Sequence, residues 1–164
     1  MSFLIKLTVW HAALGRLLDK LQPLALLAAR LYVAKIFIWS GWLKLTAWDQ
    51  TVDLFTSEYH VPLLPPAPAA VLGTFGELFF PALLVLGLFG RVGALGTFAV
   101  NAMAVISYSH VLFGEGFEAA IGQHILWGTL TLGLALFGPG AISVDWLIER
   151  RAAIHQRQPA RALS

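Results

Sequence analysis

Residues 69–89 read AAVLGTFGELFFPALLVLGLF, an apolar run that contains a single charged side chain, Glu77. An α-helix rises about 1.5 Å per residue, and the hydrocarbon core of a bilayer is about 30 Å thick. A helix built from this run is therefore long enough to cross a membrane. The sequence predicts such a span near residues 68–89.

Three other stretches have a similar length and apolar character, and they predict spans near residues 24–45, 93–113 and 119–138. The connections at 90–92 and 114–118 are short, so the spans on either side of each should be antiparallel neighbours. The expected fold class is an all-α membrane protein, a four-transmembrane-helix up-down bundle.

The composition supports this membrane assignment. The chain is 58% hydrophobic and 12% charged, whereas a soluble domain is typically about 25% charged. Its formal net charge is +2, but the basic residues gather near the ends of the predicted helices, where they act as topology signals, so no nucleic-acid partner is expected. The chain has no cysteine, which excludes thiolate nucleophiles, iron–sulfur ligation and cysteine zinc sites for this polypeptide by itself.

Three segments are expected along the chain. Residues 1–22 combine apolar and charged side chains at helical spacing, which predicts an amphipathic helix lying in the membrane interface. Residues 23–140 form the four-helix transmembrane domain. Residues 141–164 form a second interfacial helix and a polar cytoplasmic tail, and this helix can be capped by Ser143 and has Asp145 near its start, where the helix dipole favours an acid.

The charged residues also predict an orientation for the bundle. Lysine and arginine precede the first span, lie between the second and third spans, and follow the fourth, whereas the other two loops are acidic. By the positive-inside bias the basic side faces the cytoplasm, so both chain ends are expected there. The residues that carry this pattern are Lys6, Arg16, Lys20, Arg30, Arg91, Arg150, Arg151, Arg157 and Arg161 on the basic side and Asp49, Asp53, Glu58, Glu115 and Glu118 on the acidic side.

The longest loop, residues 46–66, joins the first two spans. Val52, Phe55 and Tyr59 fall on one face of a short amphipathic turn, and the prolines that follow forbid a continuous helix. We expect this loop to cap one end of the bundle.

Glu77 lies about 12–15 Å into its span, where its carboxylate cannot reach water. An ionisable group inside a bilayer costs roughly 2.5–3.5 kcal/mol, so it calls for a partner, a wet cavity or a function. Arg30 and Lys44 share one stripe of the first span and are the candidate partners, with Lys44 at the better depth, whereas Lys35 points the other way. Two interpretations stay open: a structural ion pair that locks the first two spans, or a carboxylate that handles protons or a ligand.

Two histidines lie near the outer ends of the third and fourth spans. His110 and His124 are at similar depth across one short turn, so their rings could pair. Gln123, His124, Trp127 and Thr131 fall within about 100° of arc on the fourth helix, and this face should look inward. A hydrogen-bonded structural histidine is the common outcome for such residues, and two histidines alone predict no metal site.

Together these residues predict an outward-opening polar pocket with aromatic walls. Its candidate catalytic residues are Glu77 and Lys44. Such a pocket could hold a quinone headgroup or a small polar metabolite. The candidate cofactor-binding residues are Arg30, His110, His124 and Trp127.

Three motifs, in this order and spacing, resemble the DoxX family of small bacterial integral membrane proteins. They are the stretch from Arg30 to the ending SGWLKL at 40–45, GELFFPALLVLGLFGRVGAL at 76–95, and GPGAISVDWL at 138–147. The resemblance implies a four-helix bundle in the inner membrane. It also implies links to respiratory or sulfur-redox systems, including quinone-linked thiosulfate oxidation, and to oxidative- or metal-stress operons.

The family-like polar positions in this chain are Arg30, Lys44, Glu77, Arg91 and Asp145. One departure concerns the start of the fourth span, where many relatives have a glutamate and this chain has Gln123 followed by His124. The absence of cysteine means that any thiol chemistry in such a system belongs to a partner protein.

Three functions remain compatible with the sequence, all of them in a lipid bilayer. The first is an inner-membrane subunit of a quinone-linked oxidoreductase that depends on a protein partner for electron transfer. The second is a non-catalytic accessory or scaffold protein for a partner enzyme or for a stress or metal-homeostasis operon. The third is a small proton-coupled transporter, which would have to form a homo-oligomer.

Overall fold

The computed structural model describes residues 3–157, and the regular structure in this part of the chain is entirely α-helical. Four of these helices are long and apolar enough to cross a membrane. They are α1 (Phe3–Thr46), α3 (Pro66–Leu86), α4 (Gly90–Ser107) and α6 (Glu118–Phe137). The predicted all-α fold with four membrane spans is confirmed, and the chain is a multi-pass membrane protein.

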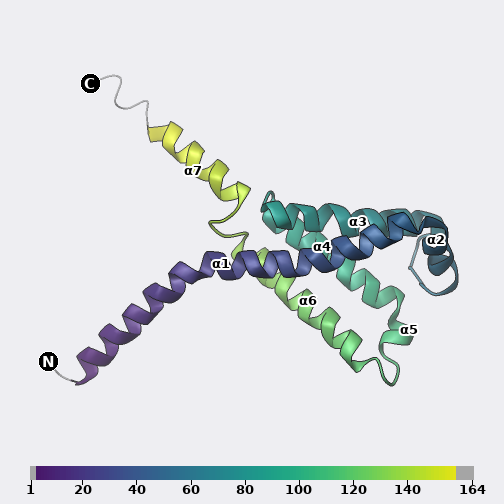
Figure 1. Cartoon of the computed structure of the whole chain (residues 1–164), viewed down its shortest axis with the longest axis horizontal. Coiled ribbons are helices and arrows are strands. Elements are labelled where there is room, and N and C mark those ends of the chain that lie inside the picture. Colours follow the sequence, from purple (N-terminus) through teal and green to yellow (C-terminus); the bar gives the residue numbers. More distant parts are fainter. Residues whose placement is uncertain (1–2, 158–164) are drawn as a thin grey trace.

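Three shorter helices complete the described chain: α2 (Trp48–Ser57), α5 (Ser109–Leu112) and α7 (Val144–Arg157). Helix α2 and α5 lie at one end of the bundle, and the start of α1 and α7 lie toward the other (Figure 1). We call these the acidic-loop end and the basic end. The predicted polar tail beyond residue 157 falls outside the described residues.

The four long helices pack in an up-down order. Helix α3 lies against both α1 and α4, and α4 lies against α6, as Figure 1 also shows. Small residues bring the helices close: a Cβ added at Gly41 would lie 2.8 Å from Cγ of Leu78, and one added at Gly76 would lie 2.7 Å from a methyl carbon of Val100. Close approach through small residues is the usual way in which membrane helices gain packing energy.

Helix α1 is continuous where the sequence predicted an interfacial helix and a separate span. It contains Pro23, and it bends in its first half (Figure 1). The large apolar side chains of that half are exposed, among them Phe3, Leu7, Trp10 and Leu14. This half therefore makes few contacts with the bundle, and its location in the membrane interface stays a prediction.

The turn between α3 and α4 lies earlier than predicted. The sequence placed it at 90–92, but α3 ends at Leu86, Gly87 and Phe89 adopt positive φ angles of 62° and 46°, and α4 already begins at Gly90. The physical reason is a cap supplied from far along the chain. The Asp145 carboxylate accepts hydrogen bonds of 2.8 Å from the backbone N–H groups of Phe89 and Gly90, so the first turn of α4 can form there.

The third span is also shorter than the predicted 93–113. Helix α4 ends at Ser107, Tyr108 breaks it with φ −115° and ψ 21°, and α5 follows as a separate turn. The backbone N–H of His60 donates to the Ser107 carbonyl oxygen at 2.8 Å, so the loop after α2 satisfies one of the free carbonyl groups at the end of α4.

Side chains bind helix ends together at the basic end. Arg91 donates to the carbonyl oxygens of Ala135 and Leu136 at 2.7 Å each, which satisfies the C-terminal end of α6. The hydroxyl of Ser143 accepts a bond of 3.2 Å from the backbone N–H of Trp146, as predicted for the cap of α7.

Candidate functional site

Lys44 and Glu77 form a hydrogen-bonded ion pair between α1 and α3. The Nζ atom of Lys44 lies 2.8 Å and 2.7 Å from the two carboxylate oxygens of Glu77, and it also donates to Oγ of Ser40 at 2.8 Å. The two charged side chains are only 14% and 12% exposed. The predicted contact between Lys44 and Glu77 is confirmed, and Gly41 permits the close approach of α1 and α3, because a Cβ added there would lie 2.8 Å from Cγ of Leu78 and 3.1 Å from Cβ of Glu77.

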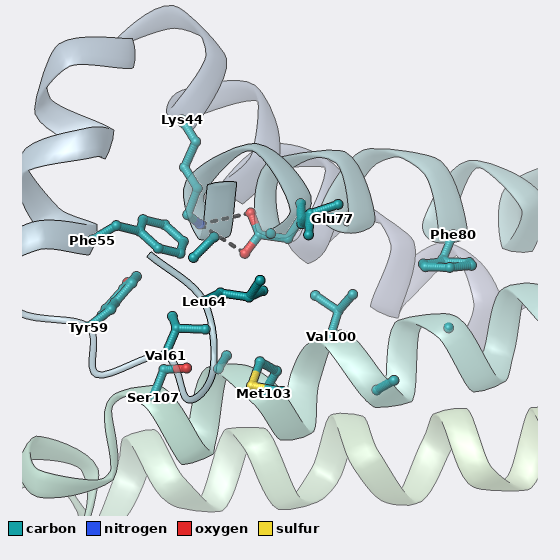
Figure 2. A pocket seen from close by; sticks show the side chains of 16 residues that line it. Lys44, Phe55, Tyr59, Val61, Leu64, Glu77, Phe80, Val100, Met103 and Ser107 are labelled. Carbon is teal, nitrogen blue, oxygen red and sulfur yellow. Dashed lines mark hydrogen bonds and ion pairs between the residues drawn. The ribbon is translucent and has the colours of Figure 1, made fainter. Parts of the chain in front are cut away.

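The ion pair lies on the wall of an apolar groove between α3 and α4, with Phe55 and Tyr59 to one side and Phe80 to the other (Figure 2). The groove has a volume of about 330 Å³. Leu72 and Met103 on its wall are exposed, so the groove lies open on the surface that the bilayer surrounds. Its other apolar lining residues include Val61, Leu64, Ala69, Phe80, Ala99 and Val100.

The loop between the first two spans covers this site, as predicted for residues 46–66. Phe55 of α2 is 6% exposed and packs with Ala69 and Ala70 of α3. Tyr59 follows α2, and its ring lies edge-on to Phe55 at 4.9 Å and to Tyr108 at 5.2 Å. In Figure 2 Phe55 and Tyr59 lie beside the end of the Lys44 side chain.

Tyr59 keeps its hydroxyl proton in this position. Burial raises the pKa of the Tyr59 phenol, and the nearby Glu77 carboxylate and Tyr108 raise it further. The cap therefore presents a neutral phenol, a group that can both donate and accept a hydrogen bond.

A second cavity of about 240 Å³ lies on the other side of the ion pair, and we call it the inner chamber. Lys44, Tyr59, Glu77 and Ala104 line both the groove and the inner chamber. The remaining walls of the inner chamber come from Ile36, Phe37, Ser40, Tyr108, Leu112, His124 and Trp127.

His124 is held in one orientation by Asn101. The Asn101 side-chain amide donates to the His124 backbone carbonyl at 2.9 Å, which turns its oxygen toward Nδ1 of the His124 ring at 2.8 Å. An amide oxygen can only accept, so Nδ1 must carry the hydrogen. In the neutral ring Nε2 is then left as an acceptor.

Trp127 lies beside His124 on α6, with ring centroids 4.9 Å apart, and edge-on to Phe37 at 5.8 Å. Its Nε1 atom is buried and has no hydrogen-bond partner among the described residues. The structure thus brings four of the six predicted site residues, Lys44, Glu77, His124 and Trp127, to the inner chamber.

Arg30 is not part of this site, so the expectation that it could meet Glu77 is wrong. Its side chain is 1% exposed and donates to the Ile142 carbonyl oxygen at 2.5 Å, at the basic end of the bundle. Arg30 and Lys44 share a helix face but are fourteen positions apart, about 21 Å along the axis. The shared helix face correctly predicted that both side chains point toward the interior of the bundle. Residues on one face can still lie at different depths in the membrane, as Arg30 and Lys44 do.

His110 also lies apart from the ion pair, and it does not pair with His124. Its ring is exposed and stacks on His60 with a centroid distance of 4.5 Å, beside Tyr108 at 5.4 Å. The reason is the break at Tyr108, because the short helix α5 turns His110 away from the direction that a continuous span would give it.

Sequence reasoning missed Asn101 and Tyr108 as members of the site. Asn101 lies on α4 and holds the His124 ring and backbone carbonyl of α6. The sequence contains a signal that could have predicted this contact, because Asn101 and His124 are polar residues in two consecutive antiparallel spans. Such residues need partners in a bilayer.

Comparison with known proteins places the chain in a family. The family model described as DoxX matches residues 25–110. The chain is 33% identical, over 135 residues, to a protein of Escherichia coli (strain K12) named Inner membrane protein YphA, and the match covers 76% of this chain and 90% of that protein. No solved structure matches the chain. From the family match and this identity together, the chain belongs to the DoxX family.

Proposed function

We propose that this chain is an inner-membrane subunit of a redox system and binds a membrane quinone in the groove between α3 and α4. The observation that carries this proposal is the position of the Lys44–Glu77 pair on the wall of an apolar groove that is open on the bilayer side. A quinone fits an apolar groove with a polar wall, because its isoprenoid chain is apolar and its headgroup carries carbonyl acceptors. The family assignment supports a membrane setting for this chemistry.

The groove suits such a ligand in size and lining. Its volume of about 330 Å³ falls within the range of roughly 300–1,000 Å³ that is common for small-molecule sites. The alkyl walls would hold the chain of the quinone, and the Tyr59 phenol would donate a hydrogen bond to a headgroup carbonyl, since the three N–H groups of Lys44 are already bonded to Ser40 and Glu77. Reduction of a quinone to a quinol takes two electrons and two protons. In this proposal a partner protein supplies the electrons, and Glu77 and Lys44 handle the protons.

We further propose that the basic end faces the cytoplasm, which places both chain ends there and the groove's covered end toward the periplasm. Support comes from Arg91, Arg150 and Arg151 at the basic end and from the acidic residues of α2 and of the turn before α6 at the opposite end.

A second candidate is an accessory protein whose buried charges only hold the helices together. One observation favours it: the start of α1 and helix α7 extend from the bundle and carry exposed apolar side chains, including Trp10, Leu147 and Ile154. These could contact a partner protein as well as lipid.

Quinone content separates the two candidates. The protein is extracted in mild detergent, and bound quinone is measured per chain for the wild type, for the double variant Lys44→Met/Glu77→Met, and for Lys35→Met as the control. Lys35 is an exposed lysine of the same helix, so its loss should leave binding unchanged. We expect bound quinone in the wild type and the control and little in the double variant. Quinone-free wild type that also fails to bind added quinone would contradict the proposal and favour the accessory function.

A further inference from the structure

One side chain that lines the inner chamber carries a buried hydrogen-bond donor with no partner among the described residues. Nε1 of Trp127 is buried without a partner, and the residue lines the chamber. Edge-to-face contacts with Phe37 and His124 hold the indole in place. Leaving a buried N–H group unpaired costs about 1–3 kcal/mol. An acceptor beside Nε1 would remove this cost.

Water meets this requirement. The chamber volume of about 240 Å³ is several times the roughly 30 Å³ that a water molecule takes up in the liquid. A buried water needs two to four polar partners, and Lys44, Glu77 and His124 line the same space as Trp127. The charges of Lys44 and Glu77 cancel each other, so the chamber carries no net charge that would require an ion.

His124 and Glu77 stand on opposite helices of this chamber, and both can exchange protons. His124 comes from α6 and Glu77 from α3. The bond to Asn101 occupies Nδ1 of His124 and leaves Nε2 as the exchanging atom. The other titratable groups that line the chamber are Lys44, Tyr59 and Tyr108.

From this geometry we propose that the inner chamber holds a chain of water molecules that carries protons between His124 and Glu77. A proton taken up by Nε2 of His124 passes to the first water, each water hands a proton to the next, and the last gives one to the Glu77 carboxylate. The waters are unchanged at the end, His124 is neutral again, and Glu77 is protonated. Trp127 positions the waters by donating to one of them.

The proposal extends the proposed function. It rests on that function in one respect only, namely that the protons delivered to Glu77 go on to a quinone. The ion pair lines both the inner chamber and the groove, so protons would reach Glu77 from the chamber and a quinone headgroup would reach it from the groove.

Proton arrival at Glu77 can be timed in the quinone-free protein, so its result does not depend on quinone binding. A caged proton is released by a flash from the protein in lipid nanodiscs, and the carboxyl band of Glu77, identified by its loss in Glu77→Gln, is followed by infrared absorption. His124→Asn is the test variant, because the asparagine amide can take the place of Nδ1 and keep the bond to Asn101 but cannot titrate. We expect protonation of Glu77 to slow about 100-fold with an unchanged final extent. An unchanged rate would overturn the proposal.

The presence of water in the inner chamber is tested in the wild-type protein, so the result does not depend on whether a variant folds. Hydroxyl radicals produced by an X-ray pulse modify side chains that touch water. We expect Trp127 to be modified more than Trp39, which is 63% exposed on the lipid-facing side of α1 and serves as the control. Unmodified Trp127 would overturn the proposal whatever the quinone measurements give.

Discussion

At the scale of single residues, the site depends on the ion pair of Lys44 and Glu77, since either charge alone would be costly to bury in the bilayer. Lys44 and Glu77 each lose most of their hydration, and the three short hydrogen bonds of Lys44 replace part of it. Removing one partner of such a pair is costly because the other charge stays buried, whereas replacing both by apolar residues is often neutral. We therefore expect the pair to hold α1 and α3 together, whether or not it also binds a ligand.

Glu77→Gln should lower the free energy of unfolding by about 3–5 kcal/mol, since Lys44 then remains charged among apolar neighbours. The double variant Lys44→Met/Glu77→Met should recover most of this loss, and Lys35→Met should change it by less than about 0.5 kcal/mol. Unfolding in mixed detergent micelles, followed by circular dichroism, measures all three. Equal stability of Glu77→Gln and the wild type would show that the carboxylate is not held by the lysine.

At the scale of helices, distant residues set the ends of the elements. Asp145 caps α4 from 56 positions beyond Phe89, and Arg91 satisfies the end of α6 from 44 positions before Ala135. This is why the sequence placed the α3–α4 turn three residues late. Local signals mark a turn near Gly90, but the donor groups that start α4 are satisfied by a residue that no local window contains.

Asp145→Ala should cost about 1 kcal/mol of stability, because it removes the acceptor for the N–H groups of Phe89 and Gly90. Glu149→Ala is the matched control, since this exposed acid of the same helix has no hydrogen bond to α4 among the described contacts. Thermal unfolding of the two variants side by side measures the difference. A loss as large for Glu149→Ala would point to general charge effects instead of capping.

At the scale of the whole molecule, hydropathy was enough to predict four spans, because each helix is apolar around most of its surface. The stripe that holds Lys44 also followed from helical periodicity, since a helix fixes which residues share a face. What the sequence could not supply was the rotation and depth of one helix against another. For that reason Glu77 was paired correctly with Lys44 and wrongly with Arg30, and the Asn101–His124 contact was missed.

The proposed orientation of the bundle is testable because the natural chain has no cysteine. Ser57→Cys places a single thiol at the exposed end of α2, and Ala152→Cys places one on the exposed surface of α7. A maleimide that cannot cross the inner membrane should label Ser57→Cys in intact spheroplasts and should label Ala152→Cys only after lysis. The opposite pattern would reverse the orientation.

The central claim, that the groove between α3 and α4 holds a quinone against Lys44 and Glu77, is tested most directly by photo-crosslinking. An azido-quinone is irradiated with the protein in lipid nanodiscs, and the modified residues are located by mass spectrometry. The account predicts modification along the groove wall, at Leu72, Val100 or Met103, which excess natural quinone suppresses. Modification that is spread over the lipid-facing surface and unaffected by excess quinone would contradict it.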